Sequence, residues 1–160
     1  MSVERVRSRD GLALVVEHYD VADARARVVL VHGYAEHRGR YAALIRQLGA
    51  EGIECHAADL RGHGQSEGPR GHVNRFEDYL DDLERVVDSV RGRGGSAPLL
   101  VLAHSLGGLI ALCYVRARPG TRYDGPYVQR MTQLAPPDEV RGPAGAARDR
   151  VDRRTHRPRR

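Results

Sequence analysis

Two runs of consecutive apolar residues, 28–31 and 99–102, most strongly constrain how this 160-residue chain can fold. A strand with one solvated face alternates apolar and polar residues, whereas a strand of a parallel sheet covered on both faces is apolar throughout. The first run ends at His32 and Gly33, and the second is followed by His104 and Ser105. Both runs therefore predict buried strands of an open, largely parallel α/β sheet.

Helical patterns separate these strands, as right-handed crossovers between parallel strands require. The first predicted helix follows the spacing of Tyr41, Leu44, Ile45 and Leu48. The second has one apolar stripe, formed by Phe76, Tyr79, Leu80, Leu83, Val86, Val87 and Val90. Asn74 is expected to cap this helix, with Glu77 completing a capping box. Residues 106–115 are apolar on nearly every side, which predicts a third helix that is fully buried.

Two further features complete the predicted sheet. Alternating apolar residues on both sides of Asp10 and Gly11 predict an antiparallel hairpin, and residues 53–58 predict a short strand before a glycine-rich loop, 59–73. Ligands of open α/β sheets bind beyond the carboxyl ends of the strands. His32, Asp59 and Ser105 all fall there, so three polar loops are expected to converge at one edge.

Ser105 lies where the strand 99–102 turns into the helix 106–115. Such a strand-to-helix elbow exposes a hydroxyl at the end of the sheet and directs a helix N-terminus at it, which favours negative charge there. The surrounding residues read AHSLG, which differs from the GxSxG elbow pattern by one methyl group, at Ala103. We interpret Ser105 as a candidate nucleophile.

Three segments together resemble a known superfamily: LVHGYAEHRGRY at 30–41, DLRGHGQSEGPRGHV at 59–73 and VLAHSLGGL at 101–109. Their order and spacing resemble the α/β-hydrolases, and more narrowly the monoacylglycerol lipase and lysophospholipase-like branch, also classified as serine aminopeptidase-like. The resemblance covers residues 1–118. It implies acyl transfer from a small acyl ester through a serine ester, with no cofactor and no metal.

The resemblance also implies roles for individual residues. Ser105 matches the nucleophile, and the backbone N–H groups of Tyr34 and Leu106 match the two donors of the oxyanion hole. Each such donor lowers the barrier by roughly 3 kcal/mol in comparable sites. The loop that contains Asp59 matches a structural loop of the family, so its acid is not expected to be catalytic. The matching loop residues are Asp59, Arg61, Gly62, Gly64 and Ser66.

The remaining candidate side chains are given structural interpretations. Adjacent side chains diverge at a tight elbow, so His104 is expected to form a structural hydrogen bond and not to act as the base. Four other histidines are interpreted as scaffold or rim residues: His32, His37, His63 and His72. Cys55 and Cys113 lack the spacing of a zinc or redox site and are expected to be buried thiols.

The apolar pattern stops at Arg118. It divides the chain into a partial hydrolase domain, 1–118, and an arginine- and proline-rich tail, 119–160, which we expect to be disordered. In the family the order is serine, acid, histidine, with the last two on loops after later strands. Those strands are expected to be absent here. The tail has one histidine, His156, preceded by Asp152, and no apolar run positions either residue, so no acid or base is placed.

The absent strands have a structural consequence. The strand 99–102 is expected to expose a long apolar edge, and the helix 106–115 is expected to lose covering layers too. The chain could associate through this edge with a partner that supplies strands. The abrupt change in composition motivates the hypothesis that the tail results from a frameshift or a gene-model error. Translation of the other two reading frames beyond Arg118 tests it, and the lack of a continuation bearing Asp and His would reject it.

Three functions stay open from the sequence: an ester hydrolase, a non-catalytic fragment that serves interaction, and a nucleic-acid-binding tail. The tail holds 10 arginines against 5 acids, and clustered arginine binds phosphates. Acids and prolines interrupt the cluster, and the tail has only two aromatic residues, Tyr123 and Tyr127, so nucleic acid is the least favoured partner. Loss of DNA retention on deletion of 119–160 would support it.

The cellular location is also constrained by the pattern of charge. The N-terminal residues are charged where a signal peptide needs an apolar stretch. No segment approaches the roughly 18 apolar residues of a membrane helix. A soluble, cytoplasmic protein is therefore expected.

Overall fold

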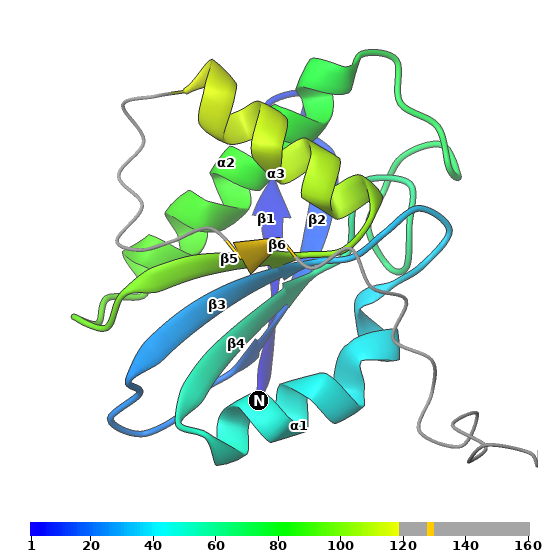
Figure 1. Cartoon of the computed structure of the whole chain (residues 1–160). Coiled ribbons are helices and arrows are strands. Elements are labelled where there is room, and N and C mark those ends of the chain that lie inside the picture. The colour runs from blue at the N-terminus through cyan, green and yellow to red at the C-terminus, as the bar shows by residue number, and fades with distance from the viewer. Residues whose placement is uncertain (119–127, 130–160) are drawn as a thin grey trace, which may run out of the picture.

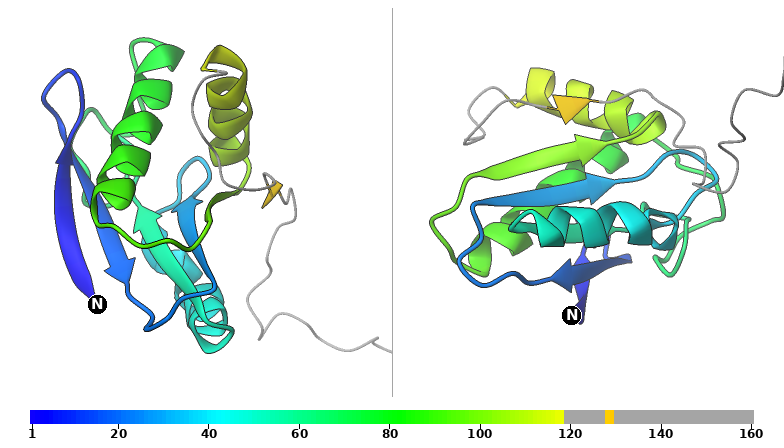
Figure 2. Two further views of the ribbon diagram at one scale, coloured as in Figure 1. Left: turned by 90° about the vertical axis from the view of Figure 1, so that its left-hand side faces the viewer. Right: turned by 60° about the horizontal axis from the view of Figure 1, so that its bottom comes forward.

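A computed structural model describes residues 1–118 and 128–129 of the chain. They form one six-stranded sheet in the order β1-β2-β4-β3-β5-β6, with helices on both faces (Figure 1). Helix α1 (Ala42–Ala50) covers one face, and helices α2 (Phe76–Gly92) and α3 (Leu106–Ala117) cover the other (Figure 2). The expected α/β architecture is confirmed.

The strands follow the predicted pattern. β1 (Ser2–Arg7) and β2 (Ala13–Tyr19) form the antiparallel hairpin, and β2 also pairs in antiparallel fashion with β4 (Ile53–Ala58). β3 (Ala26–Val31) lies between β4 and β5 (Leu99–Ala103) and is parallel to both. This central position explains why 28–31 is apolar throughout, since helices cover both faces of β3.

The core has two parts, one on each face of the sheet. The larger part holds the apolar stripe of α2, as predicted, packed with α3 against the strands. The smaller part holds Ile45 of α1 with Leu30 and Cys55. Burial raises the pKa of the Cys55 thiol to about 12, whereas Cys113 is only half-buried. The expectation of two buried thiols is therefore right for Cys55 alone.

The predicted cap of α2 is wrong by one residue. The N-cap is Arg75, not Asn74, and the Arg75 N–H donates to the Asp78 carboxylate at 3.3 Å. The Arg75 guanidinium also binds Asp78, at 2.9 Å. The capping box is thus closed by Asp78, and Glu77 stays exposed. A side-chain ion pair that the capping pattern ignores decides where the helix begins.

The apolar pattern of α3 predicts full burial, which is wrong, whereas the expected loss of covering layers agrees with the exposed side chains of this helix. Ile110, Ala111 and Tyr114 are completely buried against the sheet and α2. Leu109 and Leu112 on the opposite face are 50% and 48% exposed, and Val115 is 37% exposed. The described residues cover only the side of α3 that faces the sheet. Its uniform apolar character therefore leaves a row of large apolar side chains on the surface.

The outer edge of β5 differs from expectation at one end. β6 (Val128–Gln129) pairs in parallel with β5 through Leu102 and Ala103. The prediction that β5 lacks any neighbour is wrong for these two residues, while along 99–101 the described residues provide no partner on this side. The predicted disorder of 119–160 concerns residues that lie almost wholly outside the described part.

Two buried histidines face each other where β2 pairs with β4. His18 Nδ1 and His56 Nδ1 are 2.9 Å apart, so one nitrogen donates the proton that the other accepts. His18 Nε2 is 3.1 Å from the Glu4 carboxylate. Burial, together with His18 and Arg93, lowers the pKa of His56 to about 4. Burial also lowers the pKa of His18, so the pair resists a second proton.

This pair predicts a specific acid sensitivity. An unfolded histidine titrates near pH 6.5, so between about pH 6.5 and 4 the unfolded chain binds more protons than the folded chain, and stability falls as the pH falls. We expect His56 to account for a loss of about 2 kcal/mol between pH 7 and 4.5. Urea unfolding at both pH values should show a smaller loss in His56→Gln. The exposed-site control His72→Gln should match wild type, and equal losses in all three proteins would contradict this origin.

Candidate active site

Ser105 lies on a strained turn at the carboxyl end of β5. Its φ of 49° and ψ of −115° place a non-glycine residue in a sparsely populated region, at the N-cap of α3. The side chain is exposed. Hydrogen bonds on both sides hold the turn, from His104 N–H to Val31 O at 3.0 Å and from Gly107 N–H to His104 O at 2.9 Å. The predicted strand-to-helix elbow is therefore present.

The elbow depends on a close approach between α3 and the end of β3. A Cβ atom on Gly107 would lie 2.5 Å from Val31 O and 2.6 Å from His32 O, distances that real Cβ atoms do not show. Ala103 stands where the GxSxG pattern has its first glycine. Its methyl group fits there, because it packs into the core and Ala103 is only 3% exposed. The departure from GxSxG at Ala103 is thus accommodated, whereas the glycine at 107 is required.

The loop after β3 lies directly against this elbow. A Cβ atom on Gly33 would be 3.2 Å from Ser105 Cβ and 3.0 Å from His104 Nδ1. The next residue, Tyr34, has no hydrogen-bond acceptor for its N–H among the described residues. The Leu106 N–H belongs to the first turn of α3, where helix amides lack intrahelical acceptors. Two backbone donors that the sequence singled out thus flank the serine from separate elements.

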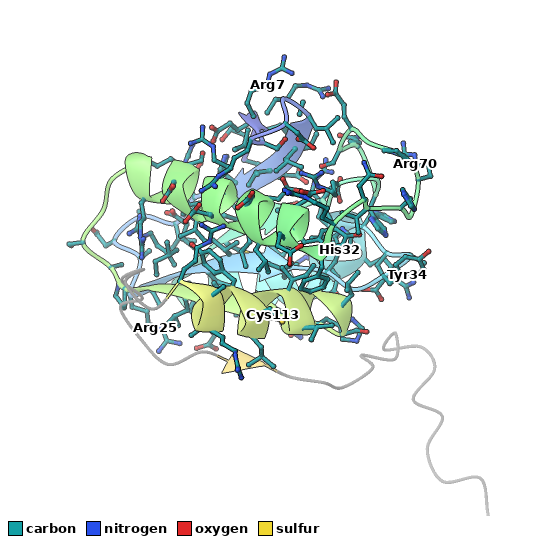
Figure 3. The ribbon with its side chains drawn as sticks, turned by 90° about the horizontal axis from the view of Figure 1, so that it is seen from above. Arg7, Arg25, His32, Tyr34, Arg70 and Cys113 are labelled. Atoms are coloured by element: carbon teal, nitrogen blue, oxygen red, sulfur yellow. The ribbon has the colours of Figure 1, made fainter. Side chains whose placement is uncertain are left out.

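The Tyr34 side chain connects this loop to the glycine-rich loop. Its hydroxyl donates to Gly71 O at 3.2 Å, and its ring packs edge-on against His63 with centroids 5.6 Å apart. The phenol is 59% exposed. Figure 3 shows Tyr34 and Arg70 at one end of the molecule and Arg25 at the opposite end, so both loops meet at the edge where the parallel strands end.

The Asp59 carboxylate is engaged entirely in scaffolding. It accepts hydrogen bonds from the Arg38 N–H at 2.8 Å and the Gln65 N–H at 2.9 Å, and it forms an ion pair with the Arg38 guanidinium. Asp59 is 1% exposed. Ser66 Oγ donates to Asp59 O at 2.7 Å and accepts the Val15 N–H at 2.9 Å. These bonds tie the loop to β2, as its structural interpretation requires.

Arg61 fixes the same loop from its other side. Its guanidinium binds the buried Asp82 of α2 at 2.6 Å and Asp10 of the hairpin turn at 2.8 Å. Burial raises the pKa of Asp82, and the Arg61 charge opposes that effect. The loop is therefore attached to the helix, the hairpin and the sheet at once.

The neighbouring histidines occupy three kinds of position. His32 is fully buried, with Nδ1 2.7 Å from Gly33 O and Nε2 accepting the Leu60 N–H at 3.0 Å. Burial lowers the pKa of His32, which keeps it a neutral link between the ends of β3 and β4. His63 is buried, with Nδ1 2.9 Å from Arg61 O. His37 and His72 are exposed at the rim.

Glu36 is a site residue that the sequence interpretation missed. Its Oε2 accepts hydrogen bonds from the Gly33 N–H at 3.1 Å and the Tyr41 hydroxyl at 2.7 Å, and it lies 3.2 Å from His104 Nδ1. Burial pushes the pKa of Glu36 upward, but these hydrogen bonds and the His104 charge outweigh it and lower the pKa. His104 therefore forms the structural hydrogen bond expected of it. The only sequence signal for Glu36 was its place inside the segment 30–41.

The Ser105 hydroxyl has no catalytic partner within residues 1–118 and 128–129. No carboxylate or imidazole in that part of the chain forms a hydrogen bond with Ser105 Oγ. Asp152 and His156 lie outside the described residues. The described residues contain no cluster of three or more His, Cys, Asp or Glu that could hold a metal, and none of their helices is long and apolar enough to span a bilayer.

Comparison with solved structures identifies the fold as that of the α/β-hydrolases. The monoacylglycerol lipase of Paleococcus ferrophilus superposes with a TM-score of 0.56 at 32% identity, over 75% of this chain and 40% of that chain. The described sheet therefore corresponds to the N-terminal half of an α/β-hydrolase. Residues 22–137 match the family model described as serine aminopeptidase, S33, and the chain belongs to this family of hydrolases. The match extends beyond the domain boundary predicted at Arg118, which stays a prediction.

Curated relatives point to the same branch. A monoacylglycerol lipase of Mycolicibacterium smegmatis is 41% identical over 113 residues, which cover 68% of this chain and 39% of that protein. A lysophospholipase of Escherichia coli is 36% identical over 98 residues, which cover 58% of this chain and 29% of that protein. The chain thus spans about two fifths or less of the length of these relatives.

The close approach at Gly107 predicts a large effect of one methyl group. We expect Gly107→Ala to destabilise the fold by about 3 kcal/mol, because the new Cβ meets carbonyl oxygens of rigid backbone. Gly49→Ala is a matched control in α1, where an added Cβ meets nothing within 4 Å, and it should stabilise by about 0.5–1 kcal/mol. Chemical denaturation measures both, and similar stabilities would contradict the proposed contact.

Proposed function

We propose that this chain carries the nucleophile half of an ester-hydrolase site of the monoacylglycerol lipase and lysophospholipase type, with Ser105 forming the acyl-enzyme. The observation that carries the proposal is the conformation of Ser105, which is strained, exposed and located at the N-terminus of α3. Strain of this kind is concentrated at functional positions. The names of the relatives support a small acyl ester as the substrate.

In this proposal the two flanking amides form the oxyanion hole. When Ser105 Oγ attacks the ester carbonyl, negative charge develops on the carbonyl oxygen, and the N–H groups of Tyr34 and Leu106 stabilise it. Both donors belong to backbone whose position is fixed before reaction, by the Gly33 contact and by α3. The positive end of the α3 dipole adds to this stabilisation. The alcohol then leaves, and water hydrolyses the serine ester.

The proton of Ser105 needs a base, and the described residues provide none in contact with it. Loss of both the base and the acid from a serine hydrolase lowers kcat by roughly a millionfold, with residual catalysis of about 10³ over water. We therefore propose that the chain by itself is nearly inactive. Its limited coverage of the relatives supports the further proposal that the chain is truncated relative to them.

A second function, as an interaction module without catalysis, is favoured by one observation. Leu109, Leu112 and Val115 form an exposed apolar row on α3, beside the outer edge of β5. Strand edges and apolar patches of this kind promote association. In this proposal a partner supplies strands that pair with β5, and Ser105 does not act as a nucleophile.

A fluorophosphonate probe distinguishes these two functions. We expect slow labelling of the purified chain that requires Ser105, at a rate orders of magnitude below that of a complete relative such as the Mycolicibacterium smegmatis lipase. Ser105→Ala should abolish the labelling. Ser96→Ala is the matched control, since Ser96 is also exposed but lies in the loop before β5, away from the elbow. Mass spectrometry of the labelled peptide identifies the modified serine.

Each outcome decides between the proposals. Labelling that persists in Ser105→Ala would remove Ser105 as the nucleophile. Complete absence of labelling after extended incubation would favour the interaction module. Rapid labelling at the rate of a complete relative would show that the chain contains a base, and would overturn the proposed inactivity.

A further inference from the structure

One carboxylate oxygen connects the two halves of the candidate site. Glu36 Oε2 receives the Gly33 N–H, the Tyr41 hydroxyl and a contact from His104 Nδ1, all between 2.7 and 3.2 Å. Gly33 belongs to the loop after β3, Tyr41 ends the turn η1 (Arg38–Tyr41), and His104 immediately precedes the serine. A single acceptor thus joins two parts of the segment 30–41 to the serine elbow, which lies 68 residues further along the chain.

We propose that Glu36 is a positioning residue that locks the Tyr34 loop onto the Ser105 elbow and so sets the geometry of the oxyanion hole. The inference rests on the proposed function of Ser105. It assigns to Glu36 a role distinct from that of an acid or base, because Glu36 acts through the backbone of Gly33 and through His104.

Glu36 binds one of two neighbouring backbone amides in this loop. Gly33 and Tyr34 offer two successive N–H groups in the loop that lies against the serine. Glu36 binds the Gly33 N–H. The Tyr34 N–H is thereby left as the donor without an acceptor among the described residues. The carboxylate therefore selects which amide of the loop is available to an oxyanion.

The backbone conformation at Ala35 also supports a positioning role for Glu36. Ala35 has a φ of 57°, in the left-handed region that costs free energy for a residue with a side chain. This conformation turns the chain back so that Glu36 reaches Gly33, three residues before it. The hydrogen bonds of Glu36 stabilise the strained turn.

The loop that contains Gly33 packs tightly against the Ser105 elbow. The Gly33 Cα is so close to Glu36 Oε2, His104 Nδ1 and Ser105 Cβ that an added methyl group would lie 3.0–3.2 Å from all three. A shift of the loop by a few tenths of an ångström would change the distance from the Tyr34 N–H to a carbonyl oxygen bound at Ser105. Hydrogen-bond strength at an oxyanion hole depends on such distances.

The charge of Glu36 is compatible with this role. The carboxylate is ionised at neutral pH, since its hydrogen bonds lower its pKa, and a bare negative charge would oppose an oxyanion nearby. Here Oε2 is occupied by three donor groups, and the Arg40 guanidinium lies 4.0 Å from Oε1. These partners offset the charge while the carboxylate holds the backbone in place.

Binding of phenylboronic acid tests the inference without requiring a catalytic base. Boron accepts the Ser105 oxygen to form a tetrahedral anionic adduct, the hydroxyl proton passes to buffer, and one boron oxygen occupies the oxyanion hole. Boron-11 NMR measures the dissociation constant in the full chain. Glu36→Ala should weaken adduct formation at least tenfold, and Glu36→Gln should restore part of the loss, because an amide oxygen can still accept the Gly33 N–H.

Amide hydrogen exchange provides the second readout. Glu36→Ala should accelerate exchange at least tenfold for the Gly33 N–H and also alter exchange around 104–107, because the two segments lose their common partner. Tyr41→Phe, which removes one of the three donors, should give a smaller effect of the same kind. Glu51→Ala is the matched control, since Glu51 is an exposed carboxylate just after α1 that pairs only with Arg25. It should change neither readout.

The outcomes separate this inference from the proposed function. If wild type and Ser105→Ala bind phenylboronic acid equally weakly, the proposed role of Ser105 fails and the positioning role falls with it. If wild type forms a Ser105-dependent adduct that Glu36→Ala leaves unchanged, Glu36 has no positioning role while the proposed function survives. Altered exchange with unchanged adduct binding would likewise overturn the inference, because it would show a contribution to local stability alone.

Discussion

The contact between helix α3 and the carboxyl end of strand β3 determines the rest of the candidate site. Gly107 brings the helix so close to the carbonyl groups of Val31 and His32 that no side chain fits between them. The turn between β5 and this helix holds Ser105 at a positive φ of 49°. It also places the Gly33 loop under the serine, so that the donors at Tyr34 and Leu106 come from the two backbones that meet there. A change in this one distance would displace the candidate nucleophile and both candidate amide donors together.

Buried side chains of the glycine-rich loop hold the walls of the site. Asp59 and Arg61 attach the glycine-rich loop to β2, to α2 and to the hairpin turn, with most of their polar atoms inside the protein. Tyr34 then spans from the loop after β3 to the glycine-rich loop through Gly71 and His63. The loops at this edge are thus bound to the core by side chains that perform no chemistry themselves. Rigid loops of this kind are what the proposed oxyanion hole needs, because its backbone amides must be preorganised before reaction.

Much of this arrangement could be predicted from the sequence because it depends on local patterns. The apolar runs gave the buried strands, the stripe on α2 gave its packing face, and AHSLG gave the elbow. The misses involve interactions between residues that no local pattern connects. Asp78 rather than Glu77 closes the cap because Arg75 pairs with it, and Glu36 escaped notice because one of its partners, His104, lies 68 residues away. The apolar pattern of α3 predicted full burial because such a pattern indicates what a helix can bury and not how many layers cover it. Its exposed face agrees instead with the expected loss of covering layers.

The position of β5 in the sheet has a consequence for how such a site can be extended. β3 and β4 are enclosed, but β5 has only the two paired residues of β6 on its outer side within the described part of the chain. Ser105 therefore lies near the outer edge of the described sheet and not at its middle. Any strand added in parallel beside β6 would bring its own carboxyl end to the same edge, a few strand widths from Ser105. In this geometry, proton-transfer groups on added strands could reach the serine from one side only, whereas both amides of the proposed oxyanion hole belong to the described residues.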